Sequence, residues 1–324
     1  MTSPETVARM SEKVALRLRE HLPVTPLVPF GALSEELGAE VLVKCEHQQR
    51  TGSFKARGSM SKILTLTPEE RERGVVTAST GNHGLGVANA LKTLGGHGIV
   101  FVPENAAATK VAAIRRLGAE VRAEGTDSGV LETVARTYAA EHGLTYVPPY
   151  NDPDIIAGQG TVAVELLEQL DGAGLDAVFV AVGGGGLVSG IASVLKQQLP
   201  NVRIYGASPL NEAPMAASIE AGHIVTVDAR PSLSDGTAGS VEPGAITFDL
   251  VRELVDEWVL VDEEAIRDAL RMVIDTEHQL VEGSAAAAFA AARARRADIA
   301  GKRVAVISCG GNIASATLAT ALAG

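Results

Sequence analysis

The chain has 324 residues, of which 46% are hydrophobic and 3% aromatic, and its formal net charge is −11. A core of small aliphatic side chains suits parallel sheets covered by helices, and the acidic charge disfavours nucleic acid and anionic membranes as partners. Two cysteines, Cys45 and Cys309, do not make a disulfide framework. No apolar leader and no membrane-length apolar run is found, which predicts a cytoplasmic protein without membrane contact.

Short β-branched runs alternate with Ala- and Leu-rich stretches along most of the chain, which predicts right-handed crossovers between parallel strands. We expect an α/β fold with two open, mostly parallel twisted sheets flanked by helices. A large domain is predicted for residues 1–55 plus 149–324, and a small domain for residues 56–148. The predicted strands are 41–43, 75–78, 99–102, 120–123, 177–182, 203–206 and 304–307; the predicted helices include 84–94, 109–117, 187–199 and a buried Ala-rich helix at 284–296.

The first candidate functional residue is Lys55, which ends the motif Thr51-Gly52-Ser53-Phe54-Lys55 after the first predicted strand. A lone lysine is more often a solvated surface charge. This one follows an apolar residue and small neighbours, which favours a place inside a site. A desolvated lysine has a lowered pKa and attacks an aldehyde as the neutral amine. The nearby Arg57 is expected either to help lower that pKa or only to pair at the surface.

The second motif, Ser79-Thr80-Gly81-Asn82-His83-Gly84, lies between a predicted strand and a predicted helix. A Gly-containing turn at this place presents free N–H groups and the positive end of the helix, so it predicts an anion site, here for a carboxylate. Asn82 adds a side-chain donor and acceptor. An ordinary N-capping Ser/Thr turn is the alternative, and the motif alone does not decide between the two.

The third motif is a run of four glycines, Gly183 to Gly186, followed by Leu187, between a predicted buried strand and a helix. In such a turn several N–H groups converge on one phosphate. No Lys-Ser/Thr pair follows, so it is not a Walker loop, and the spacing does not fit the dinucleotide fingerprint. The run therefore predicts a site for a single phosphate group rather than a merely flexible turn.

The fourth motif, Ser308-Cys309-Gly310-Gly311-Asn312, follows the last predicted strand. Ligands bind at the carboxyl ends of strands in open parallel sheets. A free cysteine is usually a small buried hydrophobe. The position of Cys309 at a strand end, beside two glycines, favours contact with a ligand.

In this order, the four motifs resemble those of the fold type II pyridoxal phosphate family, which includes threonine and serine dehydratases and serine racemase. The segment 232–239 resembles the family's loop near the cofactor, and 282–285 resembles its late active-site turn. The resemblance covers nearly the whole chain. It implies a fold like that of the tryptophan synthase β chain, pyridoxal 5'-phosphate as the cofactor and, by analogy, a homodimer.

The resemblance also implies roles for single residues. Lys55 is expected to hold the cofactor as a Schiff base and to move the Cα proton. The substrate carboxylate is expected to lie among Ser79, Thr80, Asn82 and His83. The residues expected to contact the cofactor are Phe54 beside the ring, Asn82 at the ring hydroxyl, Gly183, Gly184, Gly185, Gly186 and Leu187 at the phosphate, Gly236 in the loop at 232–239, and Cys309 at the pyridine nitrogen.

Cys309 bears on the type of reaction. A carboxylate at the pyridine nitrogen would keep that nitrogen protonated and make a strong electron sink, whereas a thiol, like the serine of many relatives, cannot. A weaker sink favours prompt loss of a β-hydroxyl group over a long-lived carbanion. The predicted activity is therefore the dehydration and deamination of L-threonine or L-serine to a 2-oxo acid and ammonia.

Two positions depart from the family pattern. Thr80 stands where serine racemase-like enzymes have serine and many dehydratases have alanine; its hydroxyl is a second candidate catalytic group and leaves racemase activity open. Ser208 stands where cation-binding relatives have glutamate, and serine is a poor ligand for a hard cation. No metal site is therefore predicted, with Glu212 left as a shifted candidate ligand.

Three other functions are weighed against this one. A dehydratase for 3-hydroxyaspartate or phenylserine would differ in the pocket walls, and an added cationic residue there would favour hydroxyaspartate. A β-replacement synthase is disfavoured because residues 51–55 differ from the Ser-x-Lys-Asp-Arg pattern of those enzymes. A non-catalytic cofactor carrier or sensor should lack the lysine or the carboxylate turn, and both are present.

Overall fold

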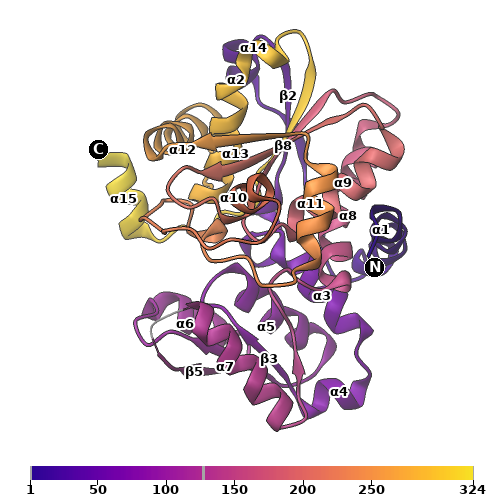
Figure 1. The fold of residues 1–324 in the computed structure, drawn as a ribbon, viewed down its shortest axis with the longest axis vertical. Helices are drawn as coiled ribbons and strands as arrows, with labels where there is room; N and C mark the ends of the chain where they lie inside the picture. Colours follow the sequence, from indigo (N-terminus) through magenta and orange to yellow (C-terminus); the bar gives the residue numbers. More distant parts are fainter. Residues whose placement is uncertain (1, 126–127, 324) are drawn as a thin grey trace.

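The computed structural model describes residues 2–125 and 128–323, which form two open α/β units, the larger one above the smaller one in Figure 1. The larger unit is built on a six-stranded sheet with the order β1-β2-β10-β7-β8-β9. Only β1 runs antiparallel to its neighbour. The strands are β1 (Leu27–Pro29), β2 (Glu40–Lys44), β10 (Arg303–Ile307), β7 (Ala177–Ala181), β8 (Arg203–Pro209) and β9 (Glu257–Val261).

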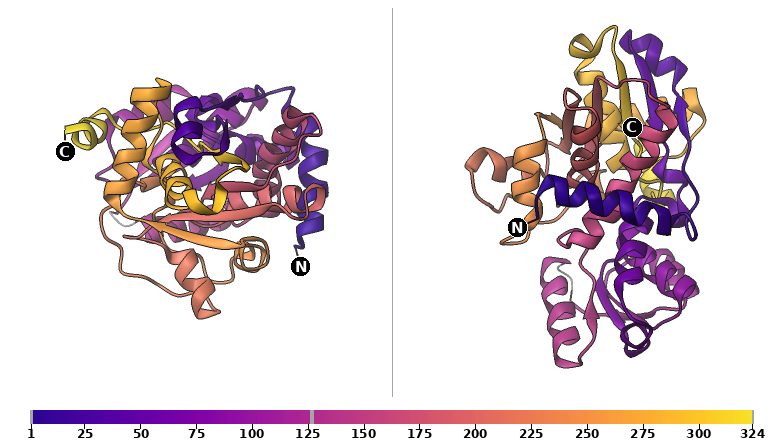
Figure 2. Two further views of the ribbon diagram at one scale, coloured as in Figure 1. Left: turned by 90° about the horizontal axis from the view of Figure 1, so that it is seen from above. Right: turned by 90° about the vertical axis from the view of Figure 1, so that its right-hand side faces the viewer.

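Helices cover both faces of this sheet. Helix α1 (Pro4–Leu18) lies on the outside of the unit, packed against α8 (Pro153–Leu170) and α9 (Gly186–Gln198), as Figure 2 shows. The Ala-rich α13 (Gly283–Ala294) is buried against the strands, because its small side chains allow close approach. The other helices of the unit are α2 (Gly31–Leu37), α10 (Pro214–Ala221), α11 (Ile246–Leu254), α12 (Glu263–Glu277), α14 (Arg296–Ile299) and α15 (Ser315–Ala323).

The smaller unit has a four-stranded parallel sheet with the order β5-β4-β3-β6. Helix α3 (Lys55–Thr65) packs against both α5 and α8, so it joins the two units. The elements of the smaller unit are α4 (Pro68–Arg73), β3 (Val75–Ala78), α5 (Asn82–Leu94), β4 (Gly98–Val102), α6 (Ala108–Arg116), β5 (Glu120–Ala123), α7 (Ser128–Glu141) and β6 (Thr145–Tyr146).

The fold class expected from the sequence is confirmed, and each predicted strand is present within a few residues of its predicted bounds. The Ala-rich helix ends at Ala294, slightly earlier than predicted. Strands β1, β6 and β9 are not among the predicted strands, because they lie at sheet edges, where polar residues such as Glu257 and Thr145 interrupt the apolar pattern. Within the described residues, no helix is long and apolar enough to cross a membrane.

The division into domains stays a proposal. We propose residues 1–55 plus 149–324 as the large domain and 56–148 as the small one. This division is supported by the two sheets, because the larger takes its strands from residues 27–44 and 177–307, and the smaller from residues 75–146.

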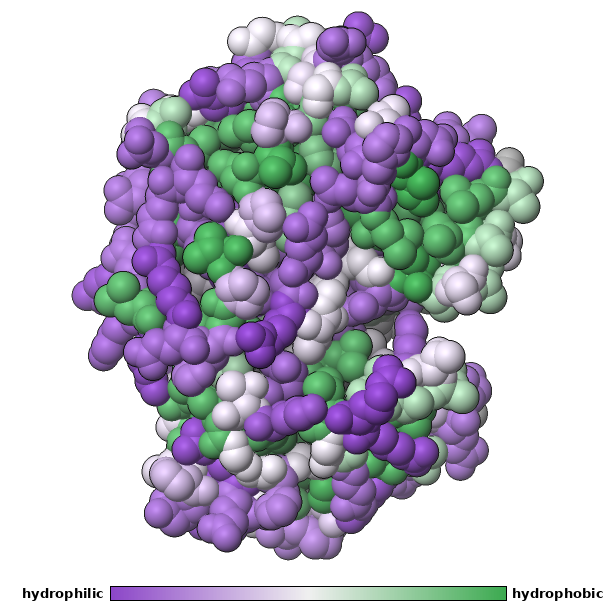
Figure 3. Space-filling model, turned by 180° about the vertical axis from the view of Figure 1, so that it is seen from behind, coloured by the Kyte–Doolittle hydropathy of each residue, from purple (hydrophilic) through white to green (hydrophobic). Residues whose placement is uncertain are grey.

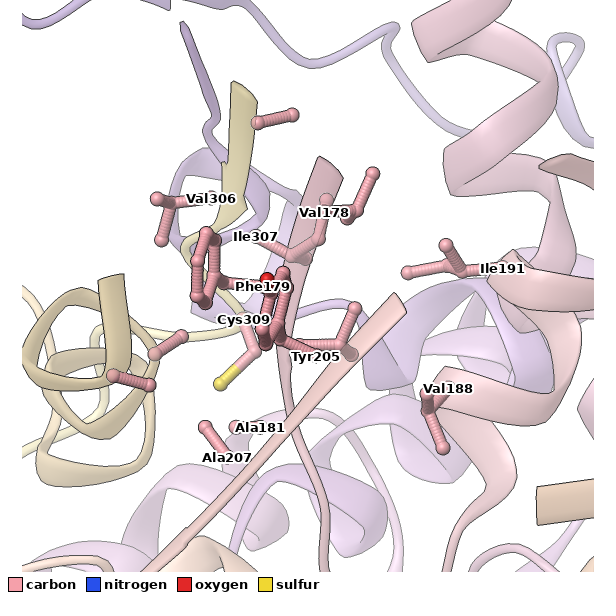
Figure 4. Packing of buried hydrophobic residues seen from close by; sticks show 14 of the residues in the cluster. Val178, Phe179, Ala181, Val188, Ile191, Tyr205, Ala207, Val306, Ile307 and Cys309 are labelled. Carbon is pink, nitrogen blue, oxygen red and sulfur yellow. The ribbon is translucent and has the colours of Figure 1, made fainter. Parts of the chain in front are cut away.

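The core of the larger unit contains apolar residues from its central strands β7, β8 and β10. Phe179 of β7 stacks on Tyr205 of β8 with ring centroids 4.6 Å apart, inside an apolar cluster that also contains Val306 and Ile307 (Figure 4). Figure 4 also shows Cys309, which follows β10, among these apolar residues. Because β2, β10 and β7 are parallel neighbours, the residues that come after each strand meet at one sheet edge.

Candidate active site

All of the predicted site residues line one cavity of about 470 Å³. In Figure 3, which views the molecule from behind, a notch separates the two units on one side. The cavity walls come from both sheets, so the site depends on how the two units pack. The predicted residues in the walls are Phe54, Lys55, Ser79, Thr80, Asn82, His83, Gly183, Gly184, Gly185, Gly186, Leu187, Gly236 and Cys309.

Lys55 is the first residue of α3, and its Nζ donates a hydrogen bond of 2.8 Å to the Pro149 carbonyl oxygen. Burial lowers the pKa of Lys55 to about 8, against the opposing effect of nearby acidic groups. The lysine segment is tied to the end of β10, because the Phe54 N–H donates to the Cys309 carbonyl at 3.0 Å and Ser53 forms a β-bridge with Gly310. This pairing fixes Lys55 beside Cys309.

The expectation that Arg57 pairs at the surface is wrong. Its side chain is 1% exposed, and its guanidinium forms ion pairs of 2.7 Å with Glu46 and with Glu165. Lys44 also contacts Glu165, at 2.7 Å. Two buried cations therefore face two buried carboxylates. The expectation that Arg57 lowers the pKa of Lys55 finds no support, since burial is the main cause of that lowering.

The turn after β3 presents unused N–H groups to the cavity. Helix α5 begins at Asn82 without a side-chain cap, so the alternative of an ordinary capping turn is not seen. The Gly81 N–H donates to Ser79 Oγ at 3.2 Å, whereas those of Thr80, Asn82 and His83 donate to no other described residue. Free N–H groups at a helix N-terminus attract an anion, as predicted for the substrate carboxylate.

The His83 side chain does not bring a positive charge to this turn. It is 3% exposed, and its Nε2 donates to the Val147 carbonyl at 3.1 Å. Burial lowers the pKa of His83 to about 3, so the imidazole is neutral. Within the described residues its Nδ1 has no partner. His83 can therefore serve an anion through its backbone N–H but not as a cationic side chain.

Two residues beside Asn82 were not among the predicted site residues. The Asn82 amide donates to the Glu282 carboxylate at 2.9 and 3.1 Å, and its oxygen accepts from Asn312 Nδ2 at 2.7 Å. Glu282 also accepts from the Asn312 backbone N–H at 3.0 Å, and burial raises its pKa to about 7. The signal in the sequence was the resemblance of 282–285 to an active-site turn, which by itself assigned no role to Glu282.

The glycine run after β7 fits a phosphate group. The N–H groups from Gly183 to Leu187 donate to no other described residue, and α9 starts at Gly186. Gly185 has a φ of +85°, which favours glycine. A Cβ on Gly184 would lie 2.5 Å from the Tyr150 ring. The loop is therefore a narrow cradle of free donors in which side chains cannot be accommodated without movement.

The last two predicted cofactor residues lie in the same cavity. Gly236 belongs to the short 3-10 helix η3 (Asp235–Thr237), and a Cβ there would lie 2.7 Å from Ser284 Oγ. Cys309 is 2% exposed, and burial raises the pKa of its thiol well above the usual value. The group at the end of β10 is therefore an uncharged thiol.

The positions weighed for a metal ion have other partners. Ser208 is buried and its Oγ donates to the Val182 carbonyl at 2.8 Å. Glu212 accepts from the Gly239 N–H at 2.7 Å, so it supports the loop that carries Gly236. Among the described residues, no group of three or more His, Cys, Asp or Glu side chains could hold a metal ion.

A family model described as "Pyridoxal-phosphate dependent enzyme" matches residues 18–310. The chain belongs to this family. It is 41% identical over 289 residues to the L-threonine ammonia-lyase of Thermotoga maritima, covering 89% of this chain and 71% of that protein. It is 36% identical over 308 residues to the L-threo-3-hydroxyaspartate ammonia-lyase of Saccharomyces cerevisiae, covering 95% and 94%. The processed threonine deaminase isoform 2 of Solanum lycopersicum superposes with a TM-score of 0.91 at 34% identity, covering 97% and 92%.

The resemblance drawn from the motifs is thus confirmed, and the cofactor of the family is pyridoxal phosphate. The site fits this group in three respects: an amine with a lowered pKa at Lys55, free N–H donors at Gly183 to Leu187, and a neutral thiol at Cys309. When bound, the cofactor draws electrons from the substrate Cα and so eases loss of its proton.

Proposed function

We propose that the chain is an ammonia-lyase that eliminates water from L-threonine and L-serine and releases a 2-oxo acid and ammonia. The observation that carries this proposal is the meeting of Lys55, the anion turn at 79–84 and an uncharged Cys309 in one cavity. The names of the ammonia-lyase relatives support the same class of reaction.

In this proposal each group of residues has a separate task. Lys55 would hold the cofactor, and its amine would move the proton of the substrate Cα, because its pKa of about 8 lets it serve as a base near neutral pH. The N–H groups of Thr80, Asn82 and His83 hold the substrate carboxylate. Asn82, held in place by Glu282 and Asn312, is the residue that would contact the cofactor ring.

The thiol of Cys309 sets the preference for elimination. An uncharged thiol beside the bound cofactor would not keep the pyridine nitrogen protonated, so the cofactor would supply a weaker electron sink, which favours loss of the β-hydroxyl group. Thr80, which lines the cavity, offers a hydroxyl group that supports a racemase side activity as the second candidate function.

The test is an assay of the purified chain with added pyridoxal phosphate. We expect L-threonine to give 2-oxobutanoate and L-serine to give pyruvate, each with one ammonia, and no product without enzyme. Chiral analysis of the remaining serine measures the racemase activity in the same sample. If neither amino acid, nor any bulkier 3-hydroxy amino acid, yields a 2-oxo acid, the proposed function is wrong.

We also propose that the chain works as a homodimer in the cytoplasm. The dimer is supported by exposed apolar side chains such as Leu280, 47% exposed, and Leu322, 43% exposed. Figure 3 shows apolar side chains gathered on one side of the larger unit. Light scattering with size-exclusion chromatography measures the oligomeric state, and a monomer would contradict the proposal. Cell fractionation tests the location.

A further inference from the structure

The side chain of Glu132, on α7, lines the active-site cavity. It lies close enough to Lys55 for each charge to affect the pKa of the other group. Yet within the part of the chain that the structure describes, the Glu132 side chain has no hydrogen bond and no ion pair within 4.0 Å. The Glu132 carboxylate and the Lys55 amine therefore line the same cavity without forming an ion pair.

The groups around Glu132 are engaged with one another. Arg136, one turn further along α7, forms its ion pair with Glu242 of the larger unit, and its guanidinium lies 4.7 Å from the centre of the Tyr146 ring. The Glu242 N–H donates to the Tyr150 hydroxyl at 2.7 Å. Arg136 and the Glu242 N–H thus have other partners. The Glu132 carboxylate remains an acceptor without a hydrogen-bond donor among the described residues.

We propose that Glu132 recognises the β-hydroxyl group of the substrate and selects neutral 3-hydroxy amino acids, an inference that rests on the proposed function. A hydroxyl group has one hydrogen to donate and two lone pairs. When the hydrogen is donated to Glu132, a lone pair stays free to accept the Cα proton that Lys55 has taken, so that the Cα–H and Cβ–O bonds break and the oxygen leaves as water. Glu132 therefore holds the leaving group without blocking its departure.

The charges of the cavity wall support the selection of neutral side chains. Among the described lining residues the only lysines or arginines are Lys55 and Lys110, and Lys110 lies 3.3 Å from Asp235 as an ion pair. Lys55 is assigned to the cofactor. A second substrate carboxylate, as in 3-hydroxyaspartate, would meet Glu132 with no unpaired cation to offset the repulsion. The described lining residues therefore include no unpaired cation that would favour 3-hydroxyaspartate as the substrate.

Glu132→Gln tests the proposal, because it keeps the shape of the side chain and removes its charge. A hydrogen bond to a charged group implies a loss of roughly 10- to 100-fold in kcat/KM for L-serine and L-threonine. Elimination from 3-chloro-L-alanine, whose leaving group has no hydrogen to donate, should change little. The relative kcat/KM for L-threo-3-hydroxyaspartate should rise. Glu141→Gln, at the exposed end of α7, is the matched control and should leave all rates unchanged.

An equal loss with L-serine and 3-chloro-L-alanine, or no loss with either, would overturn the role of Glu132. Assays of the wild-type enzyme test the proposed function separately from the role of Glu132. If the wild type releases pyruvate from 3-chloro-L-alanine but no 2-oxo acid from any hydroxy amino acid, the proposed function fails and the role of Glu132 fails with it.

A binding measurement adds a readout that does not depend on turnover. 2-Methyl-L-serine and 2-aminoisobutyrate have no hydrogen on Cα, so neither can be eliminated, and they differ by one hydroxyl group. Calorimetry on the cofactor-loaded wild type should show 2-methyl-L-serine binding on the order of tenfold more tightly. Glu132→Gln should remove this preference. Equal affinities in the wild type, or a preference that survives the substitution, would contradict the proposal.

Discussion

At the scale of single residues, the amine of Lys55 lies in a buried site that also contains acidic side chains. Lys55 lies in the same cavity as Glu132, Glu282 and the thiol of Cys309; the two carboxylates raise its pKa, but burial outweighs them. Burial also keeps the thiol of Cys309 in its neutral form and raises the pKa of Glu282. The result is a cavity in which an amine can lose its proton close to neutral pH.

This environment predicts how loading of the cofactor depends on pH. Only the neutral amine of Lys55 attacks an aldehyde, and its pKa is about 8. Below that pH, the rate of covalent attachment of pyridoxal phosphate to the cofactor-free protein should rise about tenfold per pH unit, and level off above it. Stopped-flow absorbance measures this rate. Lys55→Ala should abolish the visible absorbance of the attached cofactor; retention would show that another lysine binds it.

The sequence indicated some of these residues and not others. Lys55, Gly183 to Gly186 and Cys309 each come after a strand within a recognisable motif, so the local pattern marked them as candidates, and the resemblance of the four motifs together assigned their roles. Glu132 has no such motif, because its place in the cavity depends on how α7 packs in the smaller unit and on how the two units meet. The burial of Arg57 could not be predicted either, since its partners Glu46 and Glu165 are distant in the sequence or lie on other elements.

At the scale of elements, the site is made by the segments directly after the central strands. Strands β2, β10 and β7 are adjacent and parallel, and they lead to Lys55, Cys309 and Gly183 respectively. These strands could be predicted because each contains an uninterrupted run of at least three apolar residues. The order in which they pair could not be read from the chain, because β10 lies between two strands that precede it by many residues.

The glycine loop after β7 should not tolerate a side chain at Gly184. A Cβ there would lie 2.5 Å from the Tyr150 ring, and the Tyr150 hydroxyl is held by the Glu242 N–H. Gly184→Ala should therefore displace the loop and weaken binding of pyridoxal phosphate by roughly tenfold or more, as a cost of about 1.4 kcal/mol implies. Absorbance titration gives the Kd. Gly174→Ala, where the added Cβ meets nothing within 4 Å, should bind normally; equal Kd values would refute the cradle geometry.

At the scale of the whole molecule, a buried set of four charges joins segments far apart in the sequence. Lys44 ends β2, Glu46 lies two residues later, Arg57 lies in α3 and Glu165 lies in α8. The two positive and two negative charges balance one another. Helix α3, which begins with Lys55, is thereby connected to the segment after β2 and to α8.

Removing one of these charges should destabilise the whole fold. Glu165→Gln leaves Arg57 and Lys44 with one carboxylate in a buried position, which should lower the free energy of unfolding by about 3–5 kcal/mol. Glu168→Gln, three residues later on α8, removes a pair in which Glu168 is 52% exposed and should cost less than about 1 kcal/mol. Urea denaturation measures both. Similar losses for the two variants would mean that the buried set contributes no special stability.

The central place of β10 has a consequence for synthesis of the chain. Residues 303–307 connect the antiparallel pair of β1 and β2 to β7, β8 and β9, and Ser308 and Cys309 come directly after them. On the ribosome, the larger sheet therefore cannot close until more than nine-tenths of the 324 residues have been translated. A polypeptide released by a premature stop codon before residue 303 would leave an antiparallel strand pair and a three-stranded remnant with open edges, which are templates for aggregation. Such products are expected to be cleared by proteolysis rather than to retain partial activity.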